Sequence, residues 1–125
     1  MLKRGGEDGV ASVEMAMVAL LLITLVLGIA EASWAFAQQN AVRAVAREGA
    51  RTAAAGLDFD CADADVAAGA TCSVDLEGSE CLGTHGTFTV TAPYNDLTGF
   101  FGAFNGLTID SPVEFVVLTD EATEC

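Results

Sequence analysis

Residues 9–55 read GVASVEMAMVALLLITLVLGIAEASWAFAQQNAVRAVAREGARTAAA and contain no proline. No charged residue stands between Glu14 and Glu31. A single helix over this stretch would be roughly 70 Å long at about 1.5 Å per residue. The hydrocarbon core of a bilayer is only about 30 Å thick, so about half of such a helix must lie outside it. The stretch therefore predicts one helix at 10–56, transmembrane over 10–30 and amphipathic beyond the membrane over 31–56.

The nine residues ahead of this stretch, MLKRGGEDG, predict a leader peptide at 1–9. Lys3 and Arg4 precede the apolar run, which is a secretory pattern. The alternative is an ordinary signal peptide, cut near the small-x-small sequence AEA at 30–32. The apolar core is longer than usual for such a peptide. Because Lys3 and Arg4 lie close to the span, we expect a single-pass protein of the cytoplasmic membrane with its N-terminus in the cytoplasm.

The outer part of the helix carries an interfacial pattern followed by a basic stripe. Trp34 and Phe36 fall where an aromatic belt is expected. Arg43, Arg47 and Arg51 recur every four residues and share one face, which either is solvated or docks on an acidic surface. Glu48 is placed to pair with Arg51.

Small apolar residues cover most of the other faces of this outer part. Such a smooth surface favours tight packing against another helix or a sheet. Gly56 is the predicted end of the helix. The small apolar positions are Ala41, Val42, Ala44, Val45, Ala46 and Ala50.

Residues 57–125 form a predicted acidic extracytoplasmic domain. The whole chain has a net charge of −13, and every Lys and Arg precedes residue 52. A surface of this charge does not attract nucleic acid, whose phosphates bind cations. Asp58, Asp60, Asp63 and Asp65 offer oxygen ligands for calcium, but the EF-hand spacing is missing. A short helix over 57–69 is also possible, and we expect neither a metal nor a cofactor.

Four cysteines, Cys61, Cys72, Cys81 and Cys125, all lie in this acidic domain. Small domains often need covalent links, and disulfides form in oxidising compartments. The clustering therefore predicts disulfides and places the C-terminal side outside the cytoplasm. Three pairings are possible, and proximity alone favours Cys61–Cys72 with Cys81–Cys125. Free thiols remain an alternative, whereas a zinc site is disfavoured because there is no CxxC motif and only one His.

Three strands are predicted after the helix. TCSVDL (71–76) alternates, GTFTVTA (86–92) places Phe88 and Val90 on one face, and LTIDSPVEFVVL (107–118) is a strand with a bend at Ser111–Pro112. Residues 97–106 form an apolar helix or loop, whose phenylalanines are expected in the core of the domain or in the surface on which it rests. The predicted fold class is therefore α+β: a long N-terminal helix followed by a small antiparallel sheet linked by disulfides.

Catalytic motifs are not found in the sequence. His85 is the only His and lies in a glycine-rich segment, and GxSxG, P-loop and HExxH motifs are missing. We therefore expect a protein that is not an enzyme.

The helix stretch and the later TVT strand, LTGFFG segment and LTI strand together resemble the TadE-like proteins of tight-adherence (Tad) pilus systems. The resemblance implies a minor pilin or pseudopilin with a type IV pilin-like N-terminus. It also implies that a prepilin peptidase cuts between Gly9 and Val10, which makes Glu14 the fifth residue of the mature chain.

Pairing of opposite charges between subunits favours this implied arrangement. The new amine on Val10 of one subunit and the Glu14 carboxylate of a neighbour each resist burial alone, so their pairing would set the register between helices. The partners implied are other pilin subunits, the peptidase and the membrane. A subunit that enters a pilus would be extracellular. The alternative is an uncleaved, single-pass envelope accessory protein that does not enter the filament.

Overall fold

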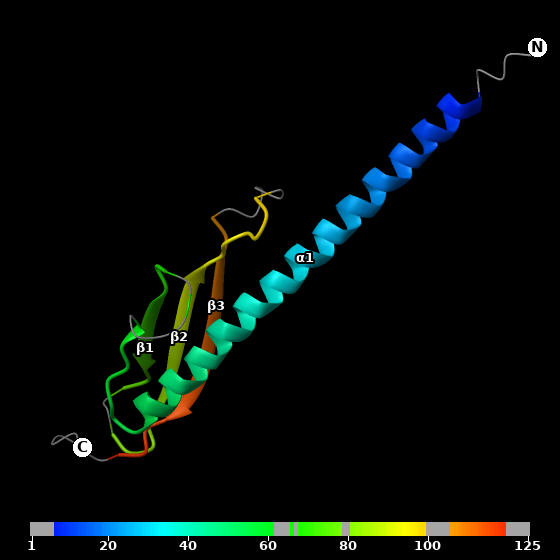
Figure 1. Ribbon diagram of the computed structural model, residues 1–125. Helices are drawn as coiled ribbons and strands as arrows, with labels where there is room; N and C mark the ends of the chain where they lie inside the picture. The colour runs from blue at the N-terminus through cyan, green and yellow to red at the C-terminus, as the bar shows by residue number, and fades with distance from the viewer. Residues whose placement is uncertain (1–6, 62–65, 67, 79–80, 100–105, 120–125) are drawn as a thin grey trace, which may run out of the picture.

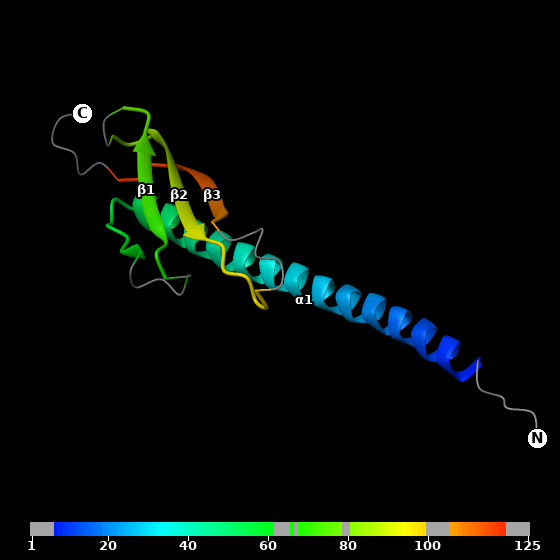
Figure 2. The ribbon, with the colours of Figure 1, turned by 90° about the horizontal axis from the view of Figure 1, so that it is seen from above.

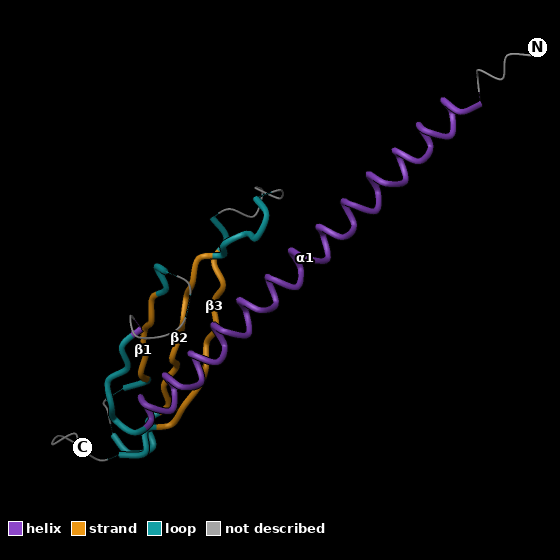
Figure 3. Tube along the Cα trace, in the orientation of Figure 1, coloured by secondary structure: helices purple, strands orange, loops and turns teal. Residues whose placement is uncertain are grey.

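One long helix dominates the computed structural model, which describes residues 7–61, 66, 68–78, 81–99 and 106–119. The helix, α1, runs from Glu7 to Ala54 over 48 residues. At about 1.5 Å per residue it is roughly 72 Å long. Its N-terminal half extends away from the rest of the molecule, and all three strands lie beside its C-terminal half (Figure 1). The tube drawing shows the same division (Figure 3).

The three strands form one antiparallel sheet in the order β1-β2-β3. They are β1 (Thr71–Leu76), β2 (His85–Pro93) and β3 (Thr108–Val116). The sheet lies along one side of α1, as the view from above also shows (Figure 2). The predicted α+β class and the three predicted strands are confirmed.

The predicted bend at Ser111–Pro112 is wrong, because β3 continues through both residues. Ser111 pairs with Val90 and Pro112 with Thr89 in an unbroken register. Proline lacks a backbone N–H, so it disrupts a central strand but is tolerated at an edge. Since β3 is an edge strand, its outer row of N–H groups needs no partner in the sheet.

The core is a single layer between α1 and the sheet. Along β2, buried and half-buried residues alternate, and Phe88 and Val90 both face the helix, as predicted. Gly49 leaves room for the Phe88 ring, which a Cβ at this position would overlap. The smooth helix face therefore packs on a sheet. The core residues are Val42, Ala46, Ala50, Ala54, Phe88, Val90, Ala92, Phe115 and Val117.

The helix ends as predicted at a glycine. Gly56 has a φ of 69°, a left-handed conformation that glycine adopts without steric cost. The N–H of Leu57 donates to Thr52 O at 3.0 Å, and the N–H of Gly56 donates to Ala53 O at 3.0 Å. This pair of bonds is a Schellman motif and satisfies carbonyls at the helix end. The helix considered at 57–69 is not present at 57–60, and 62–65 and 67 lie outside the described residues.

A disulfide joins Cys61, in the segment after α1, to Cys72 of β1. The two Cα atoms are 5.8 Å apart, within the usual range for a disulfide. The predicted Cys81–Cys125 bridge includes Cys125, which lies outside the described residues, as do Phe100, Phe101 and Phe104. The expectation that these phenylalanines lie in the core therefore stays a prediction.

Candidate functional site

The N-terminal half of α1 exposes a continuous apolar surface. Its best 18-residue window has a mean hydropathy of 2.5 and none of it is buried against the rest of the described chain. The large apolar side chains on this surface are each more than half exposed. This much bare hydrocarbon requires a lipid or apolar protein environment. These large apolar residues are Val10, Val13, Met15, Met17, Val18, Leu20, Leu21, Leu22, Ile23, Leu25, Val26 and Ile29.

The three residues predicted for processing and assembly lie in the first turns of this surface. Gly9 is helical, and a Cβ added there would meet no atom within 4 Å. Val10 is 60% exposed. Glu14 lies one turn further along, is exposed, and makes no hydrogen bond or ion pair to any described residue. All three are therefore accessible to another chain.

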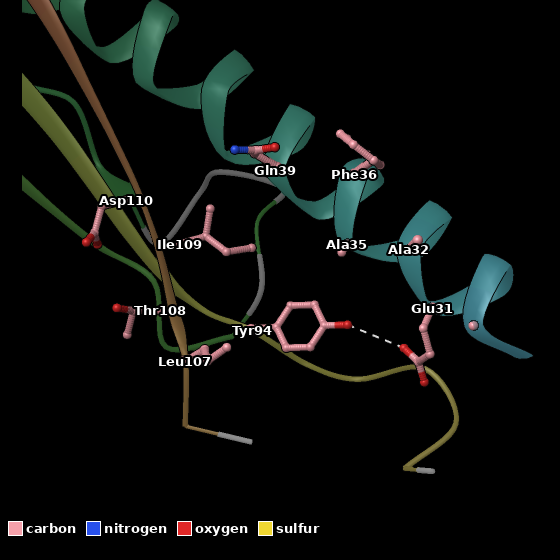
Figure 4. Close-up of a pocket in the computed structure, with 11 residues that line it drawn as sticks. Glu31, Ala32, Ala35, Phe36, Gln39, Tyr94, Leu107, Thr108, Ile109 and Asp110 are labelled. Carbon is pink, nitrogen blue, oxygen red and sulfur yellow. Dashed lines mark hydrogen bonds between the residues drawn. The ribbon is translucent and has the colours of Figure 1, made fainter. Parts of the chain in front are cut away.

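A buried carboxylate lies where the bare half of α1 ends. Glu31 is only 6% exposed, although it stands on a helix surface. The backbone N–H groups of Thr98 and Leu97 donate to its oxygens at 2.8 and 3.1 Å. The hydroxyl of Thr98 also donates to it. The hydroxyl of Tyr94 donates to it at 3.3 Å (Figure 4). Glu31 thus fixes the segment that follows β2.

Two further side chains of α1 hold the same segment. The indole N–H of Trp34 donates to Asn95 O at 2.9 Å, and the side-chain amide of Gln38 also donates to that oxygen. The N–H of Asn95 donates in return to Gln38 Oε1 at 3.2 Å. Glu31, Trp34 and Gln38 lie on one helix face at spacings of three and four residues. We call these three residues and the segment 94–98 that they bind the Glu31 clamp.

The electrostatics of the clamp favour an ionised carboxylate. The Thr98 hydroxyl lowers the pKa of Glu31, and backbone N–H groups and Tyr94 add to this against the opposing effect of burial. The pKa of Tyr94 is raised by burial, then by the charge and hydrogen bond of Glu31 and by the charge of Asp96. Sequence analysis missed this site, because Glu31 stood out only as the first charge after the apolar run.

A groove of about 680 Å³ lies beside the clamp, between α1 and the start of β3. Residues of α1 form one wall, and Ile109 and the Tyr94 ring lie opposite them (Figure 4). The lining residues are Gly28, Glu31, Ala32, Ala35, Phe36, Gln39, Tyr94, Leu107, Thr108, Ile109 and Asp110.

The basic stripe of α1 faces away from the sheet. Arg43, Arg47 and Arg51 are all exposed, and Arg51 forms the predicted ion pair with Glu48 at 3.0 Å. Arg43 and Arg47 make no ion pair within the part of the chain that the structure describes. Arg43 and Arg47 are therefore not docked on any described acid of their own chain.

A bare apolar half-helix and a small disulfide-linked sheet on the other half define a protein anchored in a membrane by one N-terminal helix. Residues 9–51 match the family model described as TadE-like protein. This match confirms, for the helix alone, the resemblance to the TadE-like proteins of Tad pilus systems that the sequence shows. The matched range lies within α1 and does not include the sheet. A search of curated proteins and a search of solved structures each returned no significant match.

Proposed function

We propose that this chain is a minor pilin or pseudopilin, a non-enzymatic structural subunit that helps to assemble a Tad-type pilus. The observation that carries the proposal is the division of α1 into two halves. The inner half is bare and apolar, and the family match at 9–51 runs through both halves. The outer half holds the sheet. Such a subunit can pass from the bilayer into a bundle of similar helices, since both environments accept an apolar helix surface.

The proposed topology has the leader in the cytoplasm and residues 57–125 outside it. The Cys61–Cys72 disulfide supports this orientation, because disulfides persist in oxidising compartments. The position of Lys3 and Arg4 next to the apolar run supports it as well. In this arrangement residues 1–9 are the leader, 10–30 span the membrane, and 31–56 carry the outer domain.

Processing and registration are assigned to the accessible start of α1. A prepilin peptidase would cut after Gly9, and the new amine on Val10 would pair with Glu14 of an adjacent pilin subunit. Gly9 lies in the first turn of the helix, where unwinding costs little because helix ends fray. Glu14 has no partner among the described residues of its own chain, so its carboxylate is available to a neighbouring subunit.

Substitution of Glu14 tests the proposal. Glu14→Ala and Glu14→Gln should both abolish pilus assembly in the native host while the chain remains in the membrane, because both remove the charge. Glu48→Ala is the matched control, since Glu48 is an exposed carboxylate of the same helix that contacts only Arg51 among the interactions described. Normal pili in both Glu14 variants would contradict the proposal.

The second candidate is an uncleaved accessory protein that stays in the envelope. It is favoured by one observation: α1 begins at Glu7, so the Gly9–Val10 peptide bond lies within the helix. Proteases bind extended substrates, and a helical bond must first unwind. An accessory anchor would tolerate Glu14→Ala without loss of pili.

A further inference from the structure

The apolar run of α1 sets the level of the bilayer surface on the molecule. Residues 10–30 number 21, which at about 1.5 Å per residue is roughly 30 Å, the thickness of the hydrocarbon core. Glu31 follows directly, so its carboxylate lies at the hydrocarbon boundary. Its hydrogen bonds to Tyr94, Leu97 and Thr98 remove the cost of an unsatisfied charge at that depth.

The clamp brings the sheet domain down to the same level. The N–H of Leu97 donates to Glu31 Oε2 at 3.1 Å, so the Leu97 backbone lies beside Glu31. Tyr94, which also contacts Glu31, donates its N–H to Leu107 O at 2.9 Å and fixes that residue nearby. The segment after β2 extends along α1 toward the bare half of the helix (Figure 1).

Four large side chains at this level are substantially exposed. Leu97 and Leu107 are each 52% exposed, and Trp34 and Phe36 are 41% and 66% exposed. We call these four residues the collar. Aromatic residues are enriched at the membrane interface, where an apolar ring and a polar group are both accommodated. The collar is continuous with the membrane-spanning surface, because Trp34 lies about one turn beyond Ala30.

We infer that the collar rests in the interface of the same bilayer that holds α1, so that the sheet domain is seated on the lipid surface. The partner is a phospholipid bilayer at the depth of its glycerol and upper acyl groups. No Lys or Arg lies in the collar or in 94–98, so binding depends on apolar contact and not on anionic headgroups. The inference requires only membrane anchoring and holds whether or not the chain enters a pilus.

Tryptophan fluorescence of the full-length protein in phosphatidylcholine nanodiscs tests whether the sheet domain rests on the lipid surface. The chain has one Trp, so Trp34→Phe gives a background without tryptophan. Leu97→Trp then reports the collar, and Leu82→Trp is the matched control. Leu82 is 62% exposed and precedes Gly83, which bonds to Val117 at the opposite end of the sheet.

The expected result is a loss of Leu97→Trp emission when brominated phosphatidylcholine replaces the ordinary lipid, and protection of that emission from aqueous iodide. Leu82→Trp should show the reverse. Equal quenching of the two probes by brominated lipid would overturn the inference, as would free access of iodide to Leu97→Trp. In the unsubstituted chain, nuclear Overhauser effects between lipid protons and Leu97 methyl groups are expected. Their absence would overturn the inference without reliance on any variant.

Discussion

At the scale of single residues, Glu31 has the largest structural role outside the core. It joins α1 to a segment that lies up to 67 positions later in the chain, and it accepts four of the hydrogen bonds that link the two. Three of the four donors belong to Leu97 and Thr98. A charge placed where the apolar run stops thus also determines where the sheet domain sits along the helix.

The clamp should depend on pH in a defined direction. The pKa of Glu31 is lower in the folded protein than its ordinary value of 4.5, mainly because the Thr98 hydroxyl donates to the carboxylate. A lowered folded pKa means that the carboxylate stabilises the fold above pH 4.5 and that this contribution is lost as the pH falls through the lower, folded value. Hydrogen-exchange protection factors of Leu97 and Thr98 should therefore be constant from neutral pH to about 4.5 and fall below it.

Glu31→Gln is the control for this titration. Its amide cannot ionise, so protection at Leu97 and Thr98 should already be low at neutral pH and should change little on acidification. If Glu31→Gln kept the protection and acid sensitivity of the native chain, other carboxylates would be responsible and the assignment to Glu31 would fail.

Gly49 is a second residue with a defined structural role, because it has no side chain. Gly49→Ala should lower the free energy of unfolding by about 1–3 kcal/mol, because the added methyl group displaces the Phe88 ring. This loss opposes the gain of about 1 kcal/mol that alanine gives over glycine in a helix. Chemical denaturation of the full-length protein in detergent micelles measures the change.

Gly28→Ala is the matched control for Gly49→Ala, since a Cβ at Gly28 meets no atom within 4 Å. It should leave stability unchanged or raise it slightly. A stabilised Gly49→Ala protein would show that the Phe88 ring moves at little cost and that the close contact is not required.

At the scale of elements, the Cys61–Cys72 disulfide helps to hold the edge strand β1 in place. Within the described residues β1 pairs with β2, whereas β2 and β3 make the main contacts with the helix. The Cys61–Cys72 bridge ties this outer strand to the segment after α1.

Replacement of Cys61 and Cys72 by serine should therefore destabilise β1 before the other strands. A disulfide of this kind contributes about 2–4 kcal/mol, so the amides of β1 should exchange faster while those of β2 keep most of their protection. Ser73→Ala, an exposed change on β1 that keeps the bridge, serves as the control. Unchanged exchange in β1 of the double variant would show that strand pairing alone holds it.

The elements that sequence patterns predicted are those governed by local periodicity. The apolar run, the alternation in 71–76 and 86–92, and the glycine at the helix end each depend on neighbouring residues, and all were found. The bend at Ser111–Pro112 was wrong because the tolerance of proline depends on whether a strand lies at an edge, which is a property of the sheet. The Glu31 clamp was missed because its partners lie more than 60 positions away.

At the scale of the whole molecule, charge and hydropathy are separated along one axis. The bare end of α1 is apolar, the basic stripe lies on its outer half, and thirteen acids follow Gly56 in the sequence. This order suits a subunit that is held in a bilayer at one end and presents an acidic surface at the other.

The most direct test of the central claim, an exported and processed pilus subunit, is the intact mass of the chain from native membranes under non-reducing conditions, together with its N-terminal residue. We predict a chain that starts at Val10 and is lighter by two protons for each disulfide. A chain that still starts at Met1 would contradict processing, and the accessory role would then be the better account.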